Sequence, residues 1–438
     1  MKIGIIGTGH VGLPTAGALA RIGHSVAATD ADRERIQLLA QGTMPFYEPG
    51  LGPLIHEEVN AGRLSFAVEA AAAIDSADVV FICVGTPPRA RGDANLLAVE
   101  RSADLVAHHA TGPAIVAEKS TVPAGTADRV SQALAHRRPD VAFPLVSNPE
   151  FLREGTAVED ALRPERILVG SDSPDAIDTM RELYRPMIEK GARWIQTDLR
   201  TAEMAKHACN AYLAMKISFS NALARLCELA GADIDMVTEV MGADPRIGPA
   251  HLAAGLGYGG SCFPKDLVAF ERLSSRLGYD FPLLREIARI NDEAVEAAFD
   301  KVEGAVWNLE EKRIALLGLA FKPGTDDIRF APALALARRL LETGATVVGY
   351  DPQAGATAKA DVPELEMAPD VYSALQGAHA AVLCTEWPEL RALDLERVRS
   401  AMAFPVIVDG RNFFDPEAMV AAGFTYIPTG RPPPTGVG

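Results

Sequence analysis

Short apolar runs alternate with longer amphipathic runs through the first part of the chain. The short runs are rich in residues that favour strands, and the longer ones have the spacing of helices. This alternation predicts βαβ units, in which helices cover a parallel sheet. The expected strands lie at residues 2–6, 25–29, 78–84, 114–118, 141–147 and 166–169.

The same alternation begins again after residue 312, with expected strands at 313–317, 346–350, 380–384 and 406–409. Between the two regions, residues 201–230 contain no Gly or Pro and predict one helix of about 45 Å, at roughly 1.5 Å per residue. We therefore expect an α/β fold of two doubly wound Rossmann-like domains joined by a long central helix and a helical middle domain. The expected boundaries are 1–196, 197–296 and 297–438, and the Pro- and Gly-rich tail from residue 430 is expected to be loosely packed.

Composition narrows the class of protein. Of 438 residues, 48% are hydrophobic and 23% charged, which is typical of a globular enzyme and excludes a disordered chain. The net charge of −16 argues against a nucleic-acid partner and at first also against anionic ligands. Five scattered cysteines without a C-x-x-C pair indicate a reduced protein without a zinc site, so we expect no metal. Apolar runs are too short for a membrane span, and glycines interrupt the N-terminal run, so we expect a soluble, cytoplasmic protein.

The first strand runs into the pattern G-x-G-x-x-G, formed by Gly7, Gly9 and Gly12. Glycines at these positions permit a tight turn and close approach of a pyrophosphate to the start of the next helix. Asp30 ends the second strand, where a carboxylate can accept hydrogen bonds from ribose hydroxyls and repel a 2′-phosphate. The combination predicts NAD as the cofactor.

Three further expected strands end in small or polar groups, at 85–87, 120–123 and 148–150. Any one of them could be only a turn, but ligands of open α/β sheets bind at the carboxyl ends of the strands. Glu150 and Glu154 are four residues apart, so they would share one face if this segment were helical. The alternative is a solvated acidic surface.

The middle region carries GLGYGGSCFPKD at 255–266, which we interpret as a loop that exposes the thiol of Cys262. A free cysteine is often a small buried hydrophobe, but Lys265 and Asp266 follow closely, and a nearby cation favours the thiolate. Cys262 is therefore the candidate nucleophile. On the expected long helix, Lys206 and Asn210 share a face, and Arg is otherwise the common cation of this chain.

The last region places polar groups after its strands, at 318–329, 385–387 and 409–412. These segments offer cations, an aromatic ring and carboxylates around a crevice large enough for a nucleotide. The first turn lacks G-x-G-x-x-G, so this half need not bind a dinucleotide, and we expect another phosphorylated ligand there.

Over almost its whole length the chain resembles the UDP-glucose/GDP-mannose dehydrogenase family. FYEPGL, FLREG and YGGSCFPKD are more similar to the UDP-glucose branch than to the GDP-mannose branch. The stretches that carry the resemblance are GTGHVGLP, FYEPGL, CVGTPP, EKSTVPAGT, NPEFLREGTA, RPERILVG, the Lys206–Asn210 segment, GYGGSCFPKD, GLAFKPGTDDIR and DGRN.

The resemblance implies a two-step, four-electron oxidation of the C6 alcohol of UDP-glucose to a carboxylate, with two NAD consumed. It implies that Cys262 forms a thiohemiacetal and then a thioester. Lys206 and Asn210 would stabilise an oxyanion, Asp266 and Thr121 would hold a water, and Glu150 would be the general base.

Binding positions also follow from the resemblance. Beyond the three glycines, the implied NAD contacts are Val11, Asp30, Arg35, Thr86, Thr121, Glu154, Lys265 and Arg329. The implied substrate contacts are Phe151, Leu152, Arg153, Glu154, Lys206, Asn210, Arg246, His251, Leu252, Ala253, Ala254, Gly255, Gly259, Lys322 and Arg411. Arg246 would act in the neighbouring subunit, so the resemblance implies a homodimer or a higher homo-oligomer.

Three alternatives stay open at this point. The same chemistry could act on another nucleotide sugar, such as a UDP-N-acetylhexosamine or GDP-mannose. A two-electron 3-hydroxyacid-type dehydrogenase shares the cofactor turn, but it needs neither Cys262 nor a second α/β domain. A non-catalytic nucleotide sensor would not need Cys262, Lys206 and Asp266 together.

Overall fold

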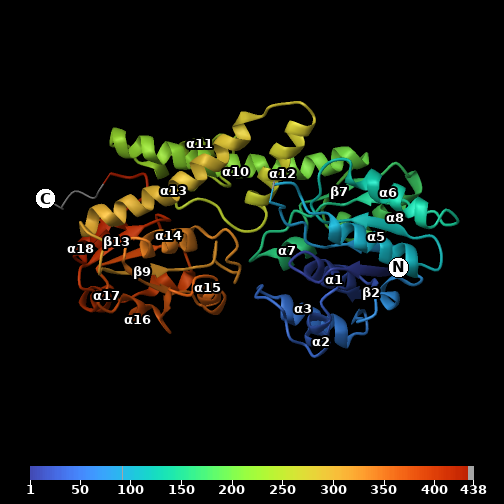
Figure 1. Ribbon diagram of the computed structural model, residues 1–438, viewed down its shortest axis with the longest axis horizontal. Coiled ribbons are helices and arrows are strands. Elements are labelled where there is room, and N and C mark those ends of the chain that lie inside the picture. The colour runs from blue at the N-terminus through green and yellow to red at the C-terminus, as the bar shows by residue number, and fades with distance from the viewer. Residues whose placement is uncertain (91, 433–438) are drawn as a thin grey trace. The chain divides into compact units, whose positions relative to one another are not determined.

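The computed structural model describes residues 1–90 and 92–432, which form two compact units (Figure 1). Among the described residues, the first unit comprises 1–90, 92–209 and 268–279, and the second comprises 210–267 and 280–432. Helix α10 (Leu199–Ala230) therefore contributes residues to both units, and so does α12 (Phe263–Arg276). The expected division into three domains remains a prediction.

The first unit is built on a sheet with strand order β3-β2-β1-β4-β5-β6-β7-β8. Its neighbours run parallel except β6 and β7, which meet antiparallel at Ser147 and Gly170. The strands are β1 (Lys2–Ile6), β2 (Ser25–Thr29), β3 (Leu64–Phe66), β4 (Val79–Ile82), β5 (Ile115–Glu118), β6 (Leu145–Ser147), β7 (Arg166–Gly170) and β8 (Arg193–Thr197).

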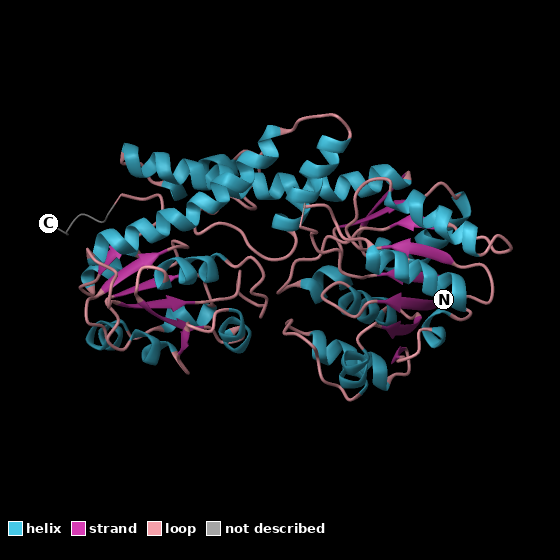
Figure 2. Ribbon diagram, viewed as in Figure 1, coloured by secondary structure: helices cyan, strands magenta, loops and turns pink. Residues whose placement is uncertain are grey.

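Helices pack on both faces of this sheet (Figure 2). Alternate residues of a strand point to opposite faces, so Val79 and Phe81 of β4 join one buried cluster while Val80 and Ile82 join another. The helices are α1 (Gly12–Arg21), α2 (Arg33–Ala40), α3 (Leu51–Asn60), α4 (Ala71–Ile74), α5 (Leu97–His109), α6 (Thr126–Arg137), α7 (Ala157–Leu162), α8 (Pro174–Leu183) and α9 (Arg185–Ile188).

The second unit repeats the strand order in a smaller parallel sheet, β11-β10-β9-β12-β13-β14. Its strands are β9 (Arg313–Leu317), β10 (Thr346–Tyr350), β11 (Glu366–Met367), β12 (Ala380–Leu383), β13 (Val406–Asp409) and β14 (Thr425–Ile427). Its helices are α11 (Ile234–Ala243), α13 (Pro282–Val306), α14 (Pro332–Leu341), α15 (Gly355–Asp361), α16 (Val371–Leu375), α17 (Leu395–Ala401) and α18 (Pro416–Ala421), with a 3₁₀ turn, η1 (Pro388–Ala392).

The expected fold class is confirmed, because both sheets have the doubly wound order and α10 is a single long helix. Strands β3, β8, β11 and β14 were not expected, since they are short or half-exposed and lack a continuous apolar run. Among the described residues, no helix has the length and apolar character needed to cross a bilayer.

The tail differs from the expectation in part. Gly430 is buried, and its N–H donates to Glu228 Oε1 at 2.7 Å, while its carbonyl accepts from Ile234 N at 2.9 Å. Arg431 pairs with Asp235. These contacts hold the start of the tail in place, and the expectation for residues 433–438 lies outside the described residues.

The two sheets also share details at the strand ends where their order reverses. Gly7 follows β1 with φ +101°, and a Cβ there would lie 2.4 Å from Cys83 O; Gly318 follows β9 with φ +87°, and a Cβ there would lie 2.4 Å from Thr385 Cβ. In both sheets the strand beside the first one is followed by a carboxylate, Asp30 after β2 and Asp351 after β10. The similarity between the two halves thus includes the turns that face ligands in such folds.

Candidate active site

The turn between β1 and α1 has the shape that a bound pyrophosphate requires. A Cβ on Gly12 would lie 1.8 Å from Gly7 O, so only glycine fits where the helix approaches the strand. A Cβ on Gly9 would meet nothing within 4 Å, which leaves that backbone open to a ligand at the start of α1. Val11 occupies the N-cap position of this helix.

Asp30 is held as an ionised carboxylate. Its Oδ2 accepts hydrogen bonds from Thr8 N at 2.7 Å and Thr8 Oγ1 at 3.0 Å, and its Oδ1 accepts from Asp32 N at 3.0 Å. Burial alone would raise the pKa of Asp30, but these hydrogen bonds and the charge of Arg35, 3.4 Å away, outweigh it and lower the pKa. A carboxylate beside an open Gly-rich turn suits the ribose of NAD, so the residues present fit this cofactor.

Polar groups line the ends of the neighbouring strands. Thr86, after β4, donates its hydroxyl hydrogen to the carbonyl of Thr121, after β5, at 2.8 Å. Ser120 Oγ accepts from Val84 N at 3.0 Å and donates to Ile82 O at 3.2 Å. These bonds connect two strand ends at the edge of the sheet where Gly7 and Asp30 also lie.

The segment from Glu150 to Glu154 is not helical, so these two residues do not share a helix face. Residues 148–153 form no regular element, and α7 begins at Ala157. Glu48 holds the start of α7, because its carboxylate accepts from Gly155 N at 2.7 Å and Ala157 N at 2.8 Å, from more than a hundred residues away. Within the loop, Glu150 accepts a hydrogen bond from Leu152 N.

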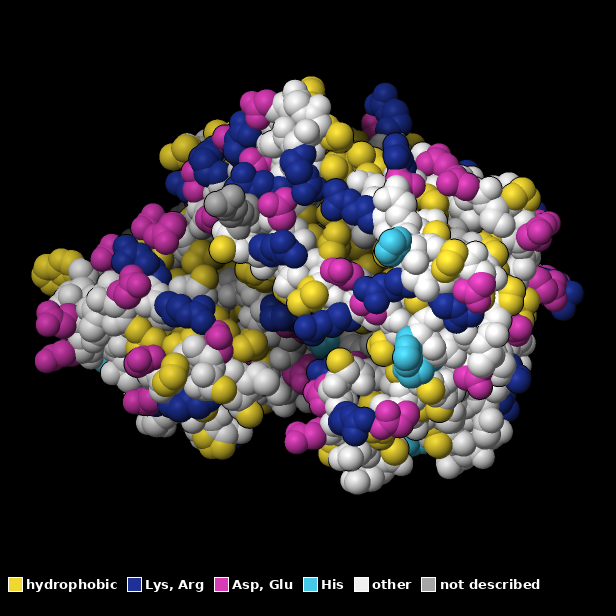
Figure 3. Space-filling view, turned by 45° about the vertical axis from the view of Figure 1, so that its right-hand side comes forward, with side chains coloured by type: hydrophobic (Ala, Val, Ile, Leu, Met, Phe, Trp, Pro, Cys, Tyr) yellow, Lys and Arg dark blue, Asp and Glu magenta, His cyan; other side chains and the backbone are white. Residues whose placement is uncertain are grey.

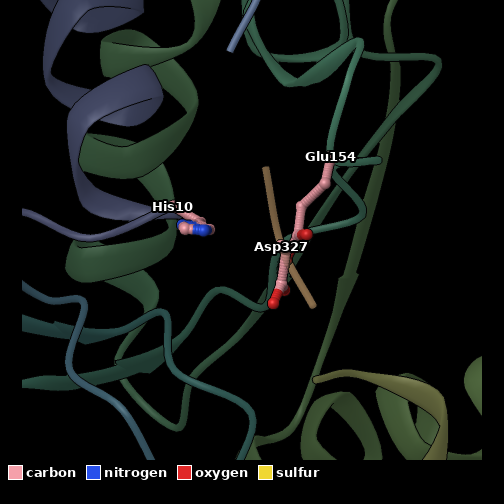
Figure 4. A group of neighbouring side chains, drawn as sticks. All are labelled: His10, Glu154 and Asp327. Carbon is pink, nitrogen blue, oxygen red and sulfur yellow. The ribbon is translucent and has the colours of Figure 1, made fainter. Parts of the chain in front are cut away.

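His10 and Glu154 come from the turn before α1 and the loop before α7 (Figure 4). A ring nitrogen of His10 lies within 4.8 Å of a carboxylate oxygen of Glu154. The His10 ring also contacts the Phe46 ring, with centroids 4.0 Å apart. The loop that carries the predicted substrate residues Phe151, Leu152, Arg153 and Glu154 is thereby placed near the dinucleotide turn.

Lys206, on α10, forms a buried ion pair with Glu150, with Nζ 3.0 Å from Oε1 and both side chains 5% exposed. Lys206 Nζ also lies 5.3 Å from the centre of the Phe151 ring. Removing either charged partner would leave the other buried without it, which is costly, so the pair fixes the orientation of both groups.

In the second unit, Cys262 lies directly before α12, and its carbonyl accepts the first helical hydrogen bond, from Asp266 N at 2.9 Å. The expected loop therefore ends at Cys262, because Pro264 is compatible with the first turn of a helix and residues 263–266 are helical. A helix N-terminus favours the thiolate form of a cysteine. The thiol is half-buried, in contrast to the fully buried Cys83 and Cys384, whose pKa values burial raises to about 12.

Asp266 is the centre of a buried polar cluster beside Cys262. Its Oδ2 accepts from Asn210 Nδ2 at 2.6 Å, and its other oxygen pairs with Lys265. The side chain of Asp266 is 1% exposed. A hydrogen bond thus joins Asn210 and Asp266, two residues that the sequence predicted as catalytic.

The loop before Cys262 requires its glycines. A Cβ on Gly259 would lie 2.5 Å from Phe330 O, and Gly260, with φ +78°, donates its N–H to Arg329 O at 2.8 Å. Arg329 in turn pairs with Asp327 at 2.6 Å. The segment 321–330 therefore packs directly against the cysteine loop.

The remaining predicted substrate residues of the second unit occupy several loops. Arg411 follows β13, and its Nε donates to Cys384 O at 2.8 Å. Arg246 is exposed and pairs with Asp244 at 2.5 Å. Lys322 lies on the 318–329 segment, and residues His251, Leu252, Ala253, Ala254 and Gly255 form the stretch that leads into the cysteine loop.

The predicted site residues divide between the two units. The first unit holds Gly7, Gly9, Val11, Gly12, Asp30, Arg35, Thr86, Thr121, Glu150, Phe151, Leu152, Arg153, Glu154 and Lys206. The second holds Asn210, Arg246, His251, Leu252, Ala253, Ala254, Gly255, Gly259, Cys262, Lys265, Asp266, Lys322, Arg329 and Arg411.

Comparison with known proteins agrees with this arrangement. Residues 1–188 match the NAD binding domain of the UDP-glucose/GDP-mannose dehydrogenase family, residues 200–293 its central domain, and residues 315–416 its UDP binding domain. The chain belongs to the UDP-glucose/GDP-mannose dehydrogenase family. The resemblance expected from the sequence is confirmed, and so are NAD as cofactor and a nucleotide-sugar substrate.

Similar proteins cover nearly the whole chain. A UDP-glucose 6-dehydrogenase of Pseudomonas aeruginosa is 43% identical over 99% of this chain and 98% of its own length, and one of Rhizobium meliloti is 43% identical over 99% and 100%. A solved UDP-glucose dehydrogenase from Pyrobaculum islandicum is 37% identical, covers 93% of this chain and 94% of its own, and has a TM-score of 0.89. A solved UDP-D-ManNAc dehydrogenase from Pyrococcus horikoshii is 29% identical over 98% and 99%, with a TM-score of 0.87.

Sequence reasoning assigned no role to two buried residues of this family member. Glu48 lies in the family stretch FYEPGL, and a lone acid between aromatic residues and Pro was the available signal. Lys119 is 8% exposed, and its Nζ donates to Asn148 Oδ1 at 3.1 Å. Asn148 lies two residues before Glu150. Burial lowers the pKa of Lys119. A lysine at the end of an apolar strand is the signal that could have pointed to it.

A buried carboxyl beside Lys119 makes the fold sensitive to pH. Glu118 is 1% exposed; its Oε1 accepts from Ser120 N at 3.0 Å, and its Oε2 has no hydrogen-bond partner among the described residues. Burial, with a smaller contribution from the charge of Glu203, raises the pKa of Glu118 from 4.5 to about 8. The folded protein therefore retains this proton between these two values while the unfolded chain releases it, and stability falls as pH rises through that window.

We expect Glu118→Gln to remove the loss of folding stability that Glu118 causes as pH rises. The unfolding free energy of the variant relative to the unchanged protein should rise by roughly 1–3 kcal/mol between pH 5 and pH 9, the range typical of a desolvated polar group. Urea denaturation at several pH values measures it, with the exposed Glu100→Gln as the matched control. Parallel stability curves for Glu118→Gln and the unchanged protein would contradict this assignment.

Proposed function

We propose that the chain catalyses the NAD-dependent, four-electron oxidation of the C6 alcohol of UDP-glucose to the carboxylate of UDP-glucuronate. The carrying observation is Cys262 at the N-terminus of α12, beside the bonded Asn210, Lys265 and Asp266, in a chain that also contains an intact dinucleotide turn. A two-electron oxidation of an alcohol needs the turn but not the thiol, so their coexistence supports the four-electron reaction.

The chemistry divides between cofactor and protein. The turn at Gly7–Gly12 with Asp30 would hold NAD, which would supply the hydride acceptor for each oxidation. The Cys262 thiol adds across the C6 aldehyde to give a thiohemiacetal, in which a C–S bond forms and the oxygen gains the proton. After the second two-electron oxidation, water attacks the resulting thioester, the C–S bond breaks, and the carboxylate and free thiol are released.

The side chains near these steps have distinct roles in the proposal. Lys206 and Asn210 stabilise the oxygen that becomes negative as tetrahedral species form. Glu150 accepts a proton from water in the hydrolysis, and its ion pair with Lys206 holds its carboxylate in place. Asp266 and Thr121 orient the water. Asp266 also holds Asn210 through the 2.6 Å hydrogen bond, so loss of its carboxylate affects both groups.

The stoichiometry of NADH tests the reaction directly. We expect two NADH for each UDP-glucose consumed, measured by absorbance at limiting substrate together with chromatography of the sugar nucleotide. One NADH per substrate would indicate a two-electron enzyme. No NADH with UDP-glucose, but two with a UDP-N-acetylhexosamine, would support the second candidate, which the likeness to the Pyrococcus horikoshii structure favours.

Replacing the thiol tests the covalent route. Cys262→Ser should lower complete turnover by roughly a thousandfold or more, because a hydroxyl is a far weaker nucleophile than a thiolate, while NAD binding and thermal stability stay unchanged. Steady-state NADH formation and NAD titration measure the two effects. Cys227→Ala, at a buried thiol of α10, is the matched control and should keep its activity. Normal turnover in Cys262→Ser would exclude the thioester.

We also propose a homodimer formed through α10 and α11, and a cytoplasmic location, which suits a chain with five scattered cysteines and no C-x-x-C pair. Large apolar side chains on these helices are exposed to an extent that is unusual for the surface of a monomeric protein. They are Tyr212 (58%), Phe219 (52%), Leu226 (59%), Leu229 (86%), Met236 (57%) and Val240 (72%). Tyr212, Phe219 and Leu226 recur every seven residues and so form one stripe on α10, and exposed Arg246 follows α11 closely enough to enter a partner's site.

Charge reversal of the stripe tests the dimer. Phe219→Asp combined with Leu226→Asp should give a monomer in sedimentation or light-scattering measurements and reduce activity, because two carboxylates would be buried in the interface. Leu277→Asp, at an equally exposed leucine of the first unit, is the matched control and should stay dimeric. An unchanged mass for the double variant would place the interface elsewhere.

A further inference from the structure

The turn after β13 has a backbone conformation that few residues adopt. Asn412 has φ +50°, in the left-handed region, where asparagine is the most tolerant residue after glycine. It directly follows Arg411, whose N–H donates to Asp409 Oδ1 at 2.9 Å. The left-handed residue thus sets the direction in which the chain leaves Arg411.

Two hydrogen bonds hold this conformation from outside the turn. Asn412 Nδ2 donates to Thr429 O at 2.7 Å, and Thr429 N donates to Asn412 Oδ1 at 2.9 Å. The side-chain amide therefore pairs with the backbone of residue 429 as one strand pairs with another. Thr429 Oγ1 adds a third bond, to Asp409 O at 3.0 Å, and Asn412 Nδ2 also lies 3.3 Å from Asp235 Oδ1.

The same turn contacts the loop that leads to Cys262. Gly410 O accepts from Leu256 N at 3.1 Å, and Arg411 Nη1 donates to Gly257 O at 3.3 Å. A Cβ on Gly255 would lie 2.5 Å from Gly410 O, so the two segments are in close contact. A shift of the turn would therefore move both the guanidinium of Arg411 and the backbone before the cysteine.

We propose that Asn412, through its left-handed backbone and its paired hydrogen bonds to Thr429, is a positioning residue that orients Arg411 toward the nucleotide diphosphate of the substrate. The inference rests on the proposed function and on Arg411 as a substrate contact, which the family resemblance implies. A guanidinium matches phosphate oxygens only in a defined orientation, so its backbone support determines affinity. Asn412 itself touches neither substrate nor cofactor in this assignment.

Two substitutions separate the backbone from the side chain. Asn412→Gly keeps the left-handed conformation but removes the pairing with Thr429, whereas Asn412→Ala removes the pairing and also strains the backbone. We expect the dissociation constant of UDP, measured by calorimetry, to rise about tenfold in Asn412→Gly and further in Asn412→Ala. The KM for UDP-glucose should rise in parallel, while kcat changes less and the dissociation constant of NAD stays the same.

Glu311→Gly is the control, because Glu311 is an exposed residue of the same unit with φ +61° and should bind UDP as the unchanged protein does. Thermal unfolding verifies that each variant is folded. Unchanged UDP binding in folded Asn412→Gly and Asn412→Ala, with normal binding by the unchanged protein, would overturn this inference alone. Failure of the unchanged protein to bind UDP would overturn the proposed function together with it.

Discussion

Buried carboxylates that accept hydrogen bonds from backbone N–H groups support three of the loops that follow strands in this chain. Glu48 holds the start of α7, and Glu203 holds the start of α6 through Gly125 N and Ala127 N, at 2.6 and 2.8 Å. Asp409 does the same for the turn after β13, where it accepts from Arg411, Phe413 and Phe414. Each of these carboxyl groups accepts two or more backbone hydrogen bonds, so the loop that it supports keeps its shape before any ligand arrives.

This use of acids removes the apparent conflict between a net charge of −16 and anionic ligands. Several carboxylates lie inside the fold, where they accept backbone hydrogen bonds or pair with Lys and Arg side chains. On the face drawn in Figure 3, Lys and Arg side chains are interspersed with Asp and Glu. The total charge therefore describes the whole molecule, whereas ligand binding depends on the local field at helix N-termini and particular cations.

Features of this fold that depend on neighbouring residues could be predicted from the sequence, and features that depend on distant partners could not. The turn at Gly7–Gly12, the strands of both sheet centres and α10 follow from local patterns, and Cys262 stands out by its context. The start of α7 after the Glu150–Glu154 loop could not be predicted, because Glu48, far away in sequence, holds it. The Asn412–Thr429 pair is hidden for the same reason, and edge strands such as β11 are too short to give a pattern.

The aspartate that follows the second strand has a different role in each sheet. In the first sheet, Asp30 keeps a partly exposed carboxylate beside an open glycine turn. In the second, Asp351 Oδ2 accepts from Leu319 N, Ala320 N and Trp387 Nε1, and Oδ1 accepts from Gln353 N and Ala354 N. A carboxylate whose two oxygens together already accept from five protein donors has no capacity left for a ribose. Dinucleotide binding in the second half would therefore first require another acceptor for the five hydrogen bonds that Asp351 now receives.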